Sequence, residues 1–368
     1  PPGGAAQAAV PRRRARTGAP PRYALDARTR RGHGRAVSEG FYRGKRVVVT
    51  GAGGFIGSHL VEALVREGAR VRALVRYTSG SRRGHLDRLP EDVLAQVEVV
   101  PGNVEDAGAV RSLVRGADVV FHLAALIGIP YSYVAPQQYV ATNVQGTLNV
   151  LEAAREHGAR VVHTSTSETY GTARYTPIDE AHPLTGQSPY SATKIGADKL
   201  AESYHLSFGL EVATIRPFNT YGPRQSSRAI IPSVMQQLAA GSAAIRIGST
   251  APVRDLNFVT DTVAGFLLVG SSARAVGQTL NVGSGRAISI GDLVRLVFEV
   301  TGKRAELVTD EARVRPDASE VMVLLADFRR AAELVGYVPR VPLEEGLART
   351  YAYIERHLAD YRPREYAI

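Results

Sequence analysis

Short runs of β-branched and aliphatic residues alternate along this chain with longer segments that are apolar on one side only. Six runs have the length and composition of buried parallel strands, at residues 45–50, 71–75, 97–100, 119–122, 161–164 and 211–216. Segments with apolar residues at helical spacing follow them, and the main ones span 55–67, 110–115, 139–157 and 190–207. Gly68 and Gly158 mark the expected ends of the first and third of these helices.

This alternation predicts an α/β fold in which a doubly wound parallel Rossmann sheet is joined to a smaller, discontinuous C-terminal α/β substrate domain. After Asn219 the pattern loosens, and Pro, Gly and Arg become frequent. We expect the dinucleotide-binding domain to comprise residues 45–219 and 252–282, with a short strand at 280–282. Residues 220–251 and 283–368 are expected to form the substrate domain.

Composition excludes several classes of protein. The chain has 368 residues, of which 44% are hydrophobic, so an ample core is available. It has no cysteine, which excludes disulfides and thiolate metal sites, and we expect no metal. We see neither a long apolar run nor a secretory signal, and therefore expect a cytoplasmic protein that does not associate with membranes.

The net charge of +10 suggests nucleic-acid binding at first sight, but the charge is not spread along the chain. Ten arginines and two acids, Asp26 and Glu39, fall within residues 1–44, so this stretch carries eight of the positive charges. It is rich in Pro, Gly and Ala and poor in large apolar residues. We expect a disordered basic tail at 1–44, and no nucleic-acid partner for the folded part.

A glycine-rich turn, Gly51-Ala52-Gly53-Gly54-Phe55-Ile56-Gly57, lies between the first predicted strand and the first predicted helix. Glycines there allow a tight turn and a close approach of the backbone to a pyrophosphate, while the helix N-terminus attracts the anion. The spacing GxxGxxG in this context predicts a dinucleotide site.

The end of the second strand bears on the choice of cofactor. A carboxylate there usually binds the adenosine ribose of NAD, but this chain has Arg76 at that place. An arginine suits the 2′-phosphate of NADP, so the sequence leans towards NADP and leaves NAD open.

Tyr190 and Lys194 are four residues apart on a predicted helix and therefore share one face. A lysine near a phenol favours the phenolate, and we expect Tyr190 to take a proton from a hydroxyl as hydride leaves for the nicotinamide. Thr166 can hydrogen-bond the same hydroxyl. Glu168 follows the fifth strand, at the sheet edge where ligands bind, and is the candidate general base.

These motifs together resemble the extended short-chain dehydrogenase/reductase superfamily over residues 45–355, and the resemblance implies a nucleotide-sugar substrate and a tightly bound NAD or NADP. Arg216-Pro217-Phe218-Asn219 belongs to the same pattern. The expected cofactor contacts are Gly51, Gly54, Phe55, Ile56, Gly57, Arg76, Asn103, Val104, Leu123, Ala124, Ala125, Asn143, Tyr190 and Lys194. The expected substrate contacts are Asn219, Arg228, Arg254 and Arg315.

Within the superfamily, FHLAALIGIPYSY (121–133), HTSTSETYG (163–171) and GQSPYSATKIGA (186–197) look like the UDP-N-acetylglucosamine 4,6-dehydratases of the legionaminic acid pathway. That likeness implies oxidation of sugar C4, removal of the C5 proton by Glu168, loss of water from C6 and return of the hydride to C6. Ser167 stands where the thymidylyl branch has an acid, which leaves the proton donor for the water open between Ser167 and Glu168.

Three other functions stay open. A UDP-glucuronate-type decarboxylase also uses a Thr-Ser-Glu triplet, whereas a plain 4-epimerase of the superfamily has a small or apolar residue in place of Glu168. A dinucleotide sensor without catalysis would not need Tyr190, Lys194 and Thr166. The family further implies a homodimer that packs through the helices at 139–157 and 190–207.

Overall fold

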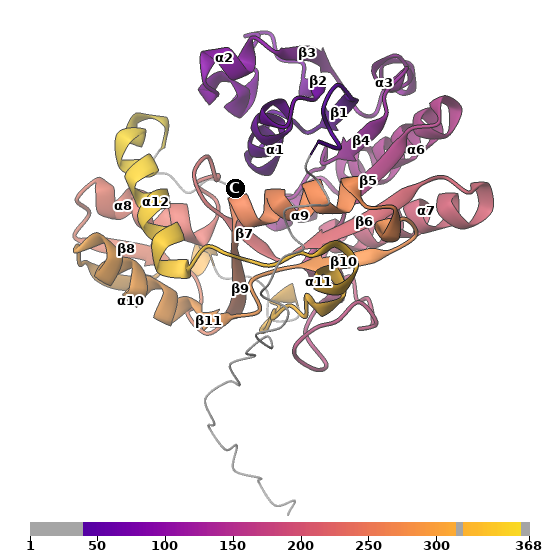
Figure 1. The fold of residues 1–368 in the computed structure, drawn as a ribbon. Helices are drawn as coiled ribbons and strands as arrows, with labels where there is room; N and C mark the ends of the chain where they lie inside the picture. Colours follow the sequence, from indigo (N-terminus) through magenta and orange to yellow (C-terminus); the bar gives the residue numbers. More distant parts are fainter. Residues whose placement is uncertain (1–39, 314–318, 362–368) are drawn as a thin grey trace, which may run out of the picture. The chain divides into compact units, whose positions relative to one another are not determined.

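A seven-stranded parallel sheet forms the centre of the computed structural model, which describes residues 40–313 and 319–361, all in one compact unit (Figure 1). The strand order is β10-β6-β5-β4-β1-β2-β3. The strands are β1 (Arg46–Thr50), β2 (Arg70–Arg76), β3 (Val97–Gly102), β4 (Val119–His122), β5 (Arg160–Thr164), β6 (Val212–Pro217) and β10 (Thr279–Val282). The doubly wound α/β fold predicted from the alternating pattern is confirmed.

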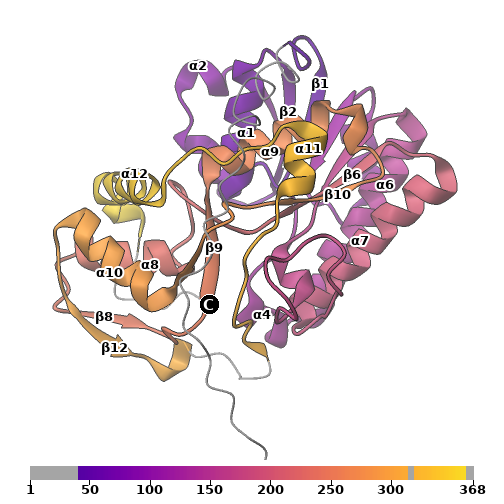
Figure 2. The same cartoon turned by 60° about the horizontal axis from the view of Figure 1, so that its bottom comes forward.

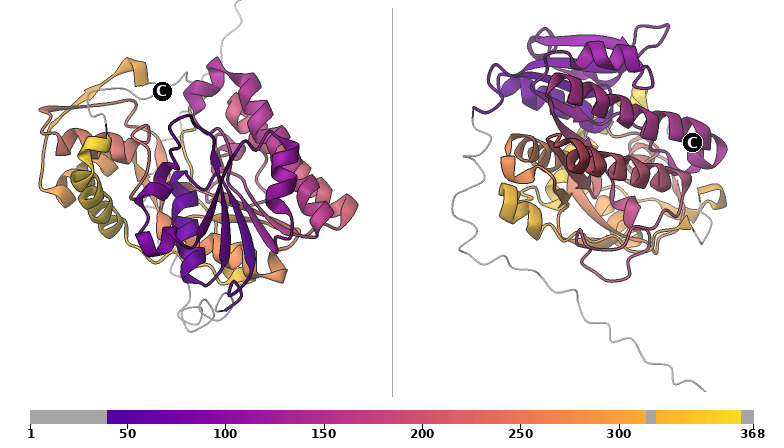
Figure 3. Two further views of the ribbon diagram at one scale, coloured as in Figure 1. Left: turned by 90° about the horizontal axis from the view of Figure 1, so that it is seen from above. Right: turned by 90° about the vertical axis from the view of Figure 1, so that its right-hand side faces the viewer.

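Helices cover both faces of this sheet (Figure 3). Val47 and Val49 of β1 pack on the face with α1 (Phe55–Arg66) and α9 (Val259–Ser271), and Val48 packs on the opposite face. That opposite face is covered by α3 (Ala107–Val114), α6 (Gly146–His157) and α7 (Pro189–Phe208). Because successive side chains of a strand point to opposite faces, only an uninterrupted apolar run can serve a sheet that is covered on both sides.

The C-terminal part forms two small sheets, β11-β9-β7 and β12-β8, with helices packed around them (Figure 2). Their strands are β7 (Asn219–Tyr221), β8 (Ala244–Ile247), β9 (Val253–Phe258), β11 (Ala287–Ser289) and β12 (Glu306–Thr309). The remaining helices are α2 (Glu91–Leu94), α4 (Ile129–Val134), α5 (Pro136–Tyr139), α8 (Ile230–Ala239), α10 (Ile290–Thr301), α11 (Arg329–Val335) and α12 (Leu343–Arg356).

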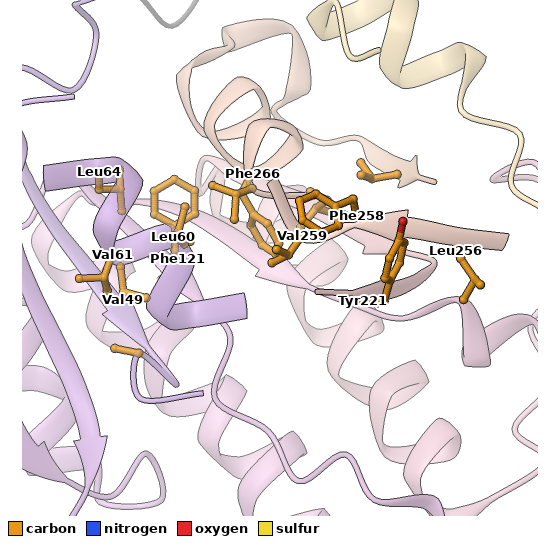
Figure 4. Packing of buried hydrophobic residues seen from close by; sticks show 14 of the residues in the cluster. Val49, Leu60, Val61, Leu64, Phe121, Tyr221, Leu256, Phe258, Val259 and Phe266 are labelled. Atoms are coloured by element: carbon orange, nitrogen blue, oxygen red, sulfur yellow. The ribbon is translucent and has the colours of Figure 1, made fainter. Parts of the chain in front are cut away.

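One hydrophobic core connects the seven-stranded sheet with the small sheet β11-β9-β7. Figure 4 shows the side chains running from Leu60 of α1 and Phe121 of β4 through Phe266 of α9 to Tyr221 and Phe258. All five side chains are buried. Since this core is shared, the domain boundaries within residues 45–368 stay a prediction.

The boundary expected at residue 44 is corrected by the structure. Tyr42 is fully buried against Phe121, and its hydroxyl donates a hydrogen bond of 2.7 Å to the Leu267 carbonyl. Residues 40–44 therefore belong to the folded unit, and the rest of the predicted tail lies outside the described residues. The aromatic pair Phe41-Tyr42 supplies the apolar surface that the preceding residues lack.

The helix expected at 139–157 is not continuous. A π-helical segment, Val140–Gln145 (η2), separates α5 from α6 and buries Thr142 and Asn143. Such segments insert one extra residue into a helical turn and are frequent beside functional sites. Within the described residues, no helix is both long and apolar enough to span a bilayer.

Candidate active site

The carboxyl ends of the central strands face a cavity of about 980 Å³, whose opposite wall comes from β7, α8 and the loops around β8 and β9. The strand order reverses between β1 and β4, and ligands of doubly wound sheets bind at such a point. The cavity wall includes most of the residues singled out from the sequence: Gly51, Gly54, Phe55, Ile56, Gly57, Arg76, Asn103, Val104, Leu123, Ala124, Ala125, Thr166, Ser167, Glu168, Tyr190, Lys194, Asn219, Arg228 and Arg254. Arg315 lies outside the described residues.

The glycine turn has no room for larger residues. Gly51 adopts a φ of +68°, and a Cβ placed there would lie 2.7 Å from the Ala124 nitrogen. A Cβ on Gly57 would lie 2.2 Å from the Gly51 carbonyl oxygen. Gly54 stands at the N-cap of α1, where it offers no capping side chain, so the first amides of the helix can serve an anion.

Arginines gather where the cavity meets the end of β2. Arg76, Arg82 and Arg83 line this part, and the Nε atom of Arg83 lies 2.6 Å from the Asp87 carboxylate. Among the described residues, two carboxylates line the cavity, Glu168 and Glu320, and neither belongs to β2. The acidic partner that NAD usually finds at this strand end is thus replaced by positive charge.

The loop after β4 is held in place by buried polar side chains. The Thr50 hydroxyl oxygen accepts hydrogen bonds of 3.1 Å from the amides of Leu123 and Ala124. Asn143, expected as a cofactor contact, lies behind the cavity wall in the described structure and bonds both the amide and the carbonyl of Leu126. Its amide also donates to the Thr193 hydroxyl at 3.0 Å. Asn143 therefore holds this loop in place, and both hydrogens of its side-chain amide are used by protein partners.

Helix α7 presents Tyr190 and Lys194 to the cavity from its first turns. The helix begins with a capping box in which the Ser188 and Ser191 side chains bond each other's backbone amides, and Pro189 follows the N-cap. Both Tyr190 and Lys194 are buried and line the cavity. Thr166, at the end of β5, hydrogen-bonds the Tyr190 side chain.

Burial dominates the electrostatics of this pair. Burial raises the pKa of Tyr190, the Thr166 hydrogen bond opposes this, and the charge of Glu168 raises it further. Burial also lowers the pKa of Lys194 to about 8, against the attraction of Asp198. Burial thus favours the protonated form of the Tyr190 phenol.

Several buried polar atoms of the cavity wall have no hydrogen-bond partner among the described residues. They are the Thr164 hydroxyl and the side-chain amide oxygens of Asn219 and Gln225. Buried polar atoms are rarely left unsatisfied, so a ligand rich in hydroxyl groups suits this wall. Asn219 was singled out from the sequence, whereas Thr164 and Gln225 were not.

Arginines also approach the cavity from the C-terminal part. Arg254 is buried and forms a 2.8 Å ion pair with Glu320, and Arg228 is exposed at the wall. Arg313, which sequence reasoning missed, lines the cavity and donates to the Ser233 hydroxyl at 3.1 Å. No local signal distinguishes Arg313 from the many other arginines of the chain, since its place depends on the packing of α8.

Comparison with known proteins agrees with this geometry. The family described as GDP-mannose 4,6 dehydratase matches residues 48–350. A dTDP-glucose 4,6-dehydratase from Streptomyces antibioticus is 35% identical, with coverage of 86% of this chain and 94% of that protein. UDP-glucuronic acid decarboxylase 1 from Xenopus tropicalis is 30% identical, with coverage of 88% and 75%. The crystal structure of a dTDP-glucose 4,6-dehydratase from Streptomyces venezuelae with NAD bound has a TM-score of 0.76 at 31% identity, with coverage of 86% and 99%.

The fold, the glycine turn and the Thr/Tyr/Lys set define a nicotinamide-dependent short-chain dehydrogenase/reductase. The chain belongs to the GDP-mannose 4,6 dehydratase family within the NAD-dependent epimerase/dehydratase superfamily, whose members are enzymes that act on nucleotide sugars. The cavity fits the cofactor, because the glycine turn lines it and the uncapped N-terminus of α1 offers its first amides to a phosphate there.

Proposed function

We propose that this protein is a nucleotide-sugar 4,6-dehydratase that forms a 4-keto-6-deoxy sugar. One observation carries the proposal: Glu168 lines the same cavity as Tyr190 and acts on its pKa through its charge. A carboxylate so placed can remove a proton from the sugar carbon next to the one that is oxidised. A plain 4-epimerase has no use for that base.

Each residue then has a defined task. Bound NAD or NADP supplies a hydride acceptor for C4 and the same hydride for C6. Thr166 orients the C4 hydroxyl, and Tyr190 takes its proton, with the Lys194 ammonium favouring the phenolate. The C4 ketone acidifies the C5 proton, which Glu168 removes. The C6 hydroxyl leaves as water with a proton from Glu168 or Ser167. When the hydride returns to C6, C5 takes up a proton again, so the turnover loses one water and no net electrons.

We infer that the sugar is an amino sugar of the UDP-N-acetylglucosamine type. The loop after β4 places Leu126, Ile127, Ile129 and Pro130 in the cavity wall, and Ile129 packs with Tyr190 in one apolar cluster. An acetyl methyl gains from contact with such a surface, whereas a bare hydroxyl does not. The likeness of residues 121–133 to the UDP-N-acetylglucosamine 4,6-dehydratases supports the same choice.

For the cofactor we propose NADP, on the strength of Arg76 at the end of β2 and of Arg82 and Arg83 in the loop that follows it. Relatives have been solved with NAD, so the arginines are the feature that argues for the additional phosphate. We also propose a homodimer that packs through η2, α6 and α7. Val140 on η2 is 52% exposed in the single chain, and Val144 and Ile195 beside it are half-buried.

A substrate panel tests the proposed function. The purified protein is incubated with UDP-, GDP-, CDP- and dTDP-linked hexoses, their N-acetylamino forms and the uronates, and products are identified by mass spectrometry. We expect loss of one water from UDP-N-acetylglucosamine without added cofactor oxidant. Loss of carbon dioxide from a uronate would assign a decarboxylase, and an isomer of unchanged mass an epimerase.

A further inference from the structure

Helix α7 carries a third buried polar residue on the face of Tyr190 and Lys194. Asp198 follows Lys194 by four positions, so the three side chains form one row on the helix. It is 6% exposed, and the proposed mechanism does not use it. We propose that Asp198 is a positioning residue, which fixes the end of β5 against α7 and places a carboxylate one turn from Lys194 on the same helix face. This inference rests on the proposed proton relay.

The carboxylate of Asp198 is saturated with donors from two neighbouring strands. His163 of β5 donates to Oδ1 at 3.0 Å, and the Ser165 hydroxyl donates to Oδ2 at 2.6 Å. Arg216 of β6 donates to Oδ2 at 2.7 Å. Burial opposes ionisation, yet the Arg216 guanidinium and the His163 hydrogen bond hold the pKa of Asp198 well below its usual range. The group is therefore an anion at neutral pH.

These contacts connect α7, which carries Tyr190 and Lys194, to the segment that carries Thr166 and Glu168. Ser165 directly precedes Thr166, and its hydroxyl also accepts from the Arg216 Nε atom at 3.1 Å. Arg216 also donates a hydrogen bond of 2.8 Å to the Tyr170 hydroxyl. Tyr170 ends the single helical turn Ser167–Tyr170 (η3), which contains Glu168. The buried cluster Asp198–Arg216–Ser165–Tyr170 thus holds the backbone on both sides of Thr166 and Glu168.

The same carboxylate supplies the charge that a buried ammonium needs. Burial lowers the pKa of Lys194 to about 8, and Asp198 is the group that raises it. The other titratable groups near the relay are Tyr131, Tyr139, Glu168, Tyr170, Tyr190, His122, His163 and Arg216. Burial lowers the pKa of both histidines, so neither competes as a cation at neutral pH. Arg216 is already paired with Asp198, which limits its repulsion of Lys194.

The test is an NMR titration of the lysines in the full-length protein. The chain has four lysines, Lys45, Lys194, Lys199 and Lys303, so protein labelled with 13C-lysine gives a resolvable set of Cε signals. We expect Lys194 to titrate near pH 8 in the natural protein and at least about one unit lower in Asp198→Asn. The other three lysines should not move.

A matched control removes a buried aspartate elsewhere. Asp261 is also buried and accepts hydrogen bonds from the amides of Arg340 and Val341, so Asp261→Asn likewise alters a buried, hydrogen-bonded carboxylate. It should lower stability without changing the Lys194 titration. An unchanged Lys194 pKa in folded Asp198→Asn would overturn the proposal.

A second variant, Ser165→Ala, removes one link of the cluster without changing its charge. We expect kcat on the sugar substrate to fall about tenfold, with cofactor affinity and the Lys194 titration preserved. If Ser165→Ala has the kcat of the natural protein, the cluster around Asp198 does not position the catalytic residues. This result holds even if Asp198→Asn does not fold. The titration needs no substrate. If the protein turns over no nucleotide sugar, the proposed function is refuted, but the titration still tests the effect of Asp198 on Lys194.

Discussion

The phenol of Tyr190 lies in a site that by itself opposes ionisation, since burial and the nearby Glu168 both raise its pKa. The proposed function of Tyr190 as a base therefore relies on the Lys194 ammonium to offset these two effects. Replacing Tyr190 with Phe keeps the apolar contact with Ile129 and removes only the proton acceptor. We expect kcat to fall by ~10²- to 10⁴-fold with cofactor affinity retained. Turnover close to that of the natural protein would exclude Tyr190 from the relay.

Glu168 is expected to act after the oxidation at C4. In Glu168→Gln the amide cannot take the C5 proton, so the sugar stops as the 4-ketone while the hydride stays on the cofactor. We expect the near-ultraviolet absorbance of reduced nicotinamide to accumulate on addition of substrate, with at least a hundredfold loss of product. A variant that dehydrates at the full rate would show that another group is the base.

Arg76 bears on cofactor preference. Its side chain lines the cavity at the end of β2, and no carboxylate of the described residues belongs to this part of the cavity wall. Arg76→Ala should weaken NADP binding by about tenfold, because one charge-assisted contact to the 2′-phosphate is lost, and leave NAD binding unchanged. Titration calorimetry with both cofactors checks this. An equal loss of affinity for NADP and for NAD would show that Arg76 does not contact the 2′-phosphate.

At the scale of elements, the turn between β1 and α1 depends on close backbone contacts. A Cβ on Gly57 would lie 2.2 Å from the Gly51 oxygen, so Gly57→Ala must open the turn that approaches the pyrophosphate. We expect at least a tenfold loss of cofactor affinity with the fold preserved by circular dichroism. Gly291→Ala at the start of α10, where the nearest atom is 3.6 Å away, is the matched control and should bind normally.

The elements that the sequence predicted well are those whose signals are local. Val47–Val49 form a continuous apolar run followed by glycines, and Tyr190 and Lys194 share a helix face by spacing alone. The strands of the large sheet, its parallel order and the edge at which Thr166 and Glu168 lie all follow from such patterns. The edge strand at 279–282 could be expected for the same reason.

Elements and contacts that depend on several distant segments were not predictable. The π-helical segment arises where α5 and α6 both pack on α7. No pattern within residues 140–145 predicts it. The cluster around Asp198 joins β5, β6 and α7, and each member is an ordinary polar residue in the sequence. Asn143 was assigned to the cofactor because its burial behind the loop at Leu126 is visible only in three dimensions.

At the scale of the whole molecule, the η2, α6 and α7 surface carries apolar side chains that a single chain leaves exposed. Val140 is 52% exposed, and a Cβ on Gly196 would lie 3.7 Å from Val144, so η2 and α7 meet closely beneath this surface. In a two-fold dimer the same patch packs on its own copy, so the exposed valine of each of the two chains is buried.

A charge on this surface should therefore separate the two copies. Val140→Glu places two carboxylates in an apolar contact, where each is desolvated and repels the other, while the single chain accommodates it in solvent. We expect light scattering to show half the mass of the natural protein, with cofactor affinity preserved because the cavity is formed within one chain. Val338→Glu, at an exposed site between α11 and α12, should leave the mass unchanged. If Val140→Glu and the natural protein have the same mass, the dimer either does not form or packs through another face.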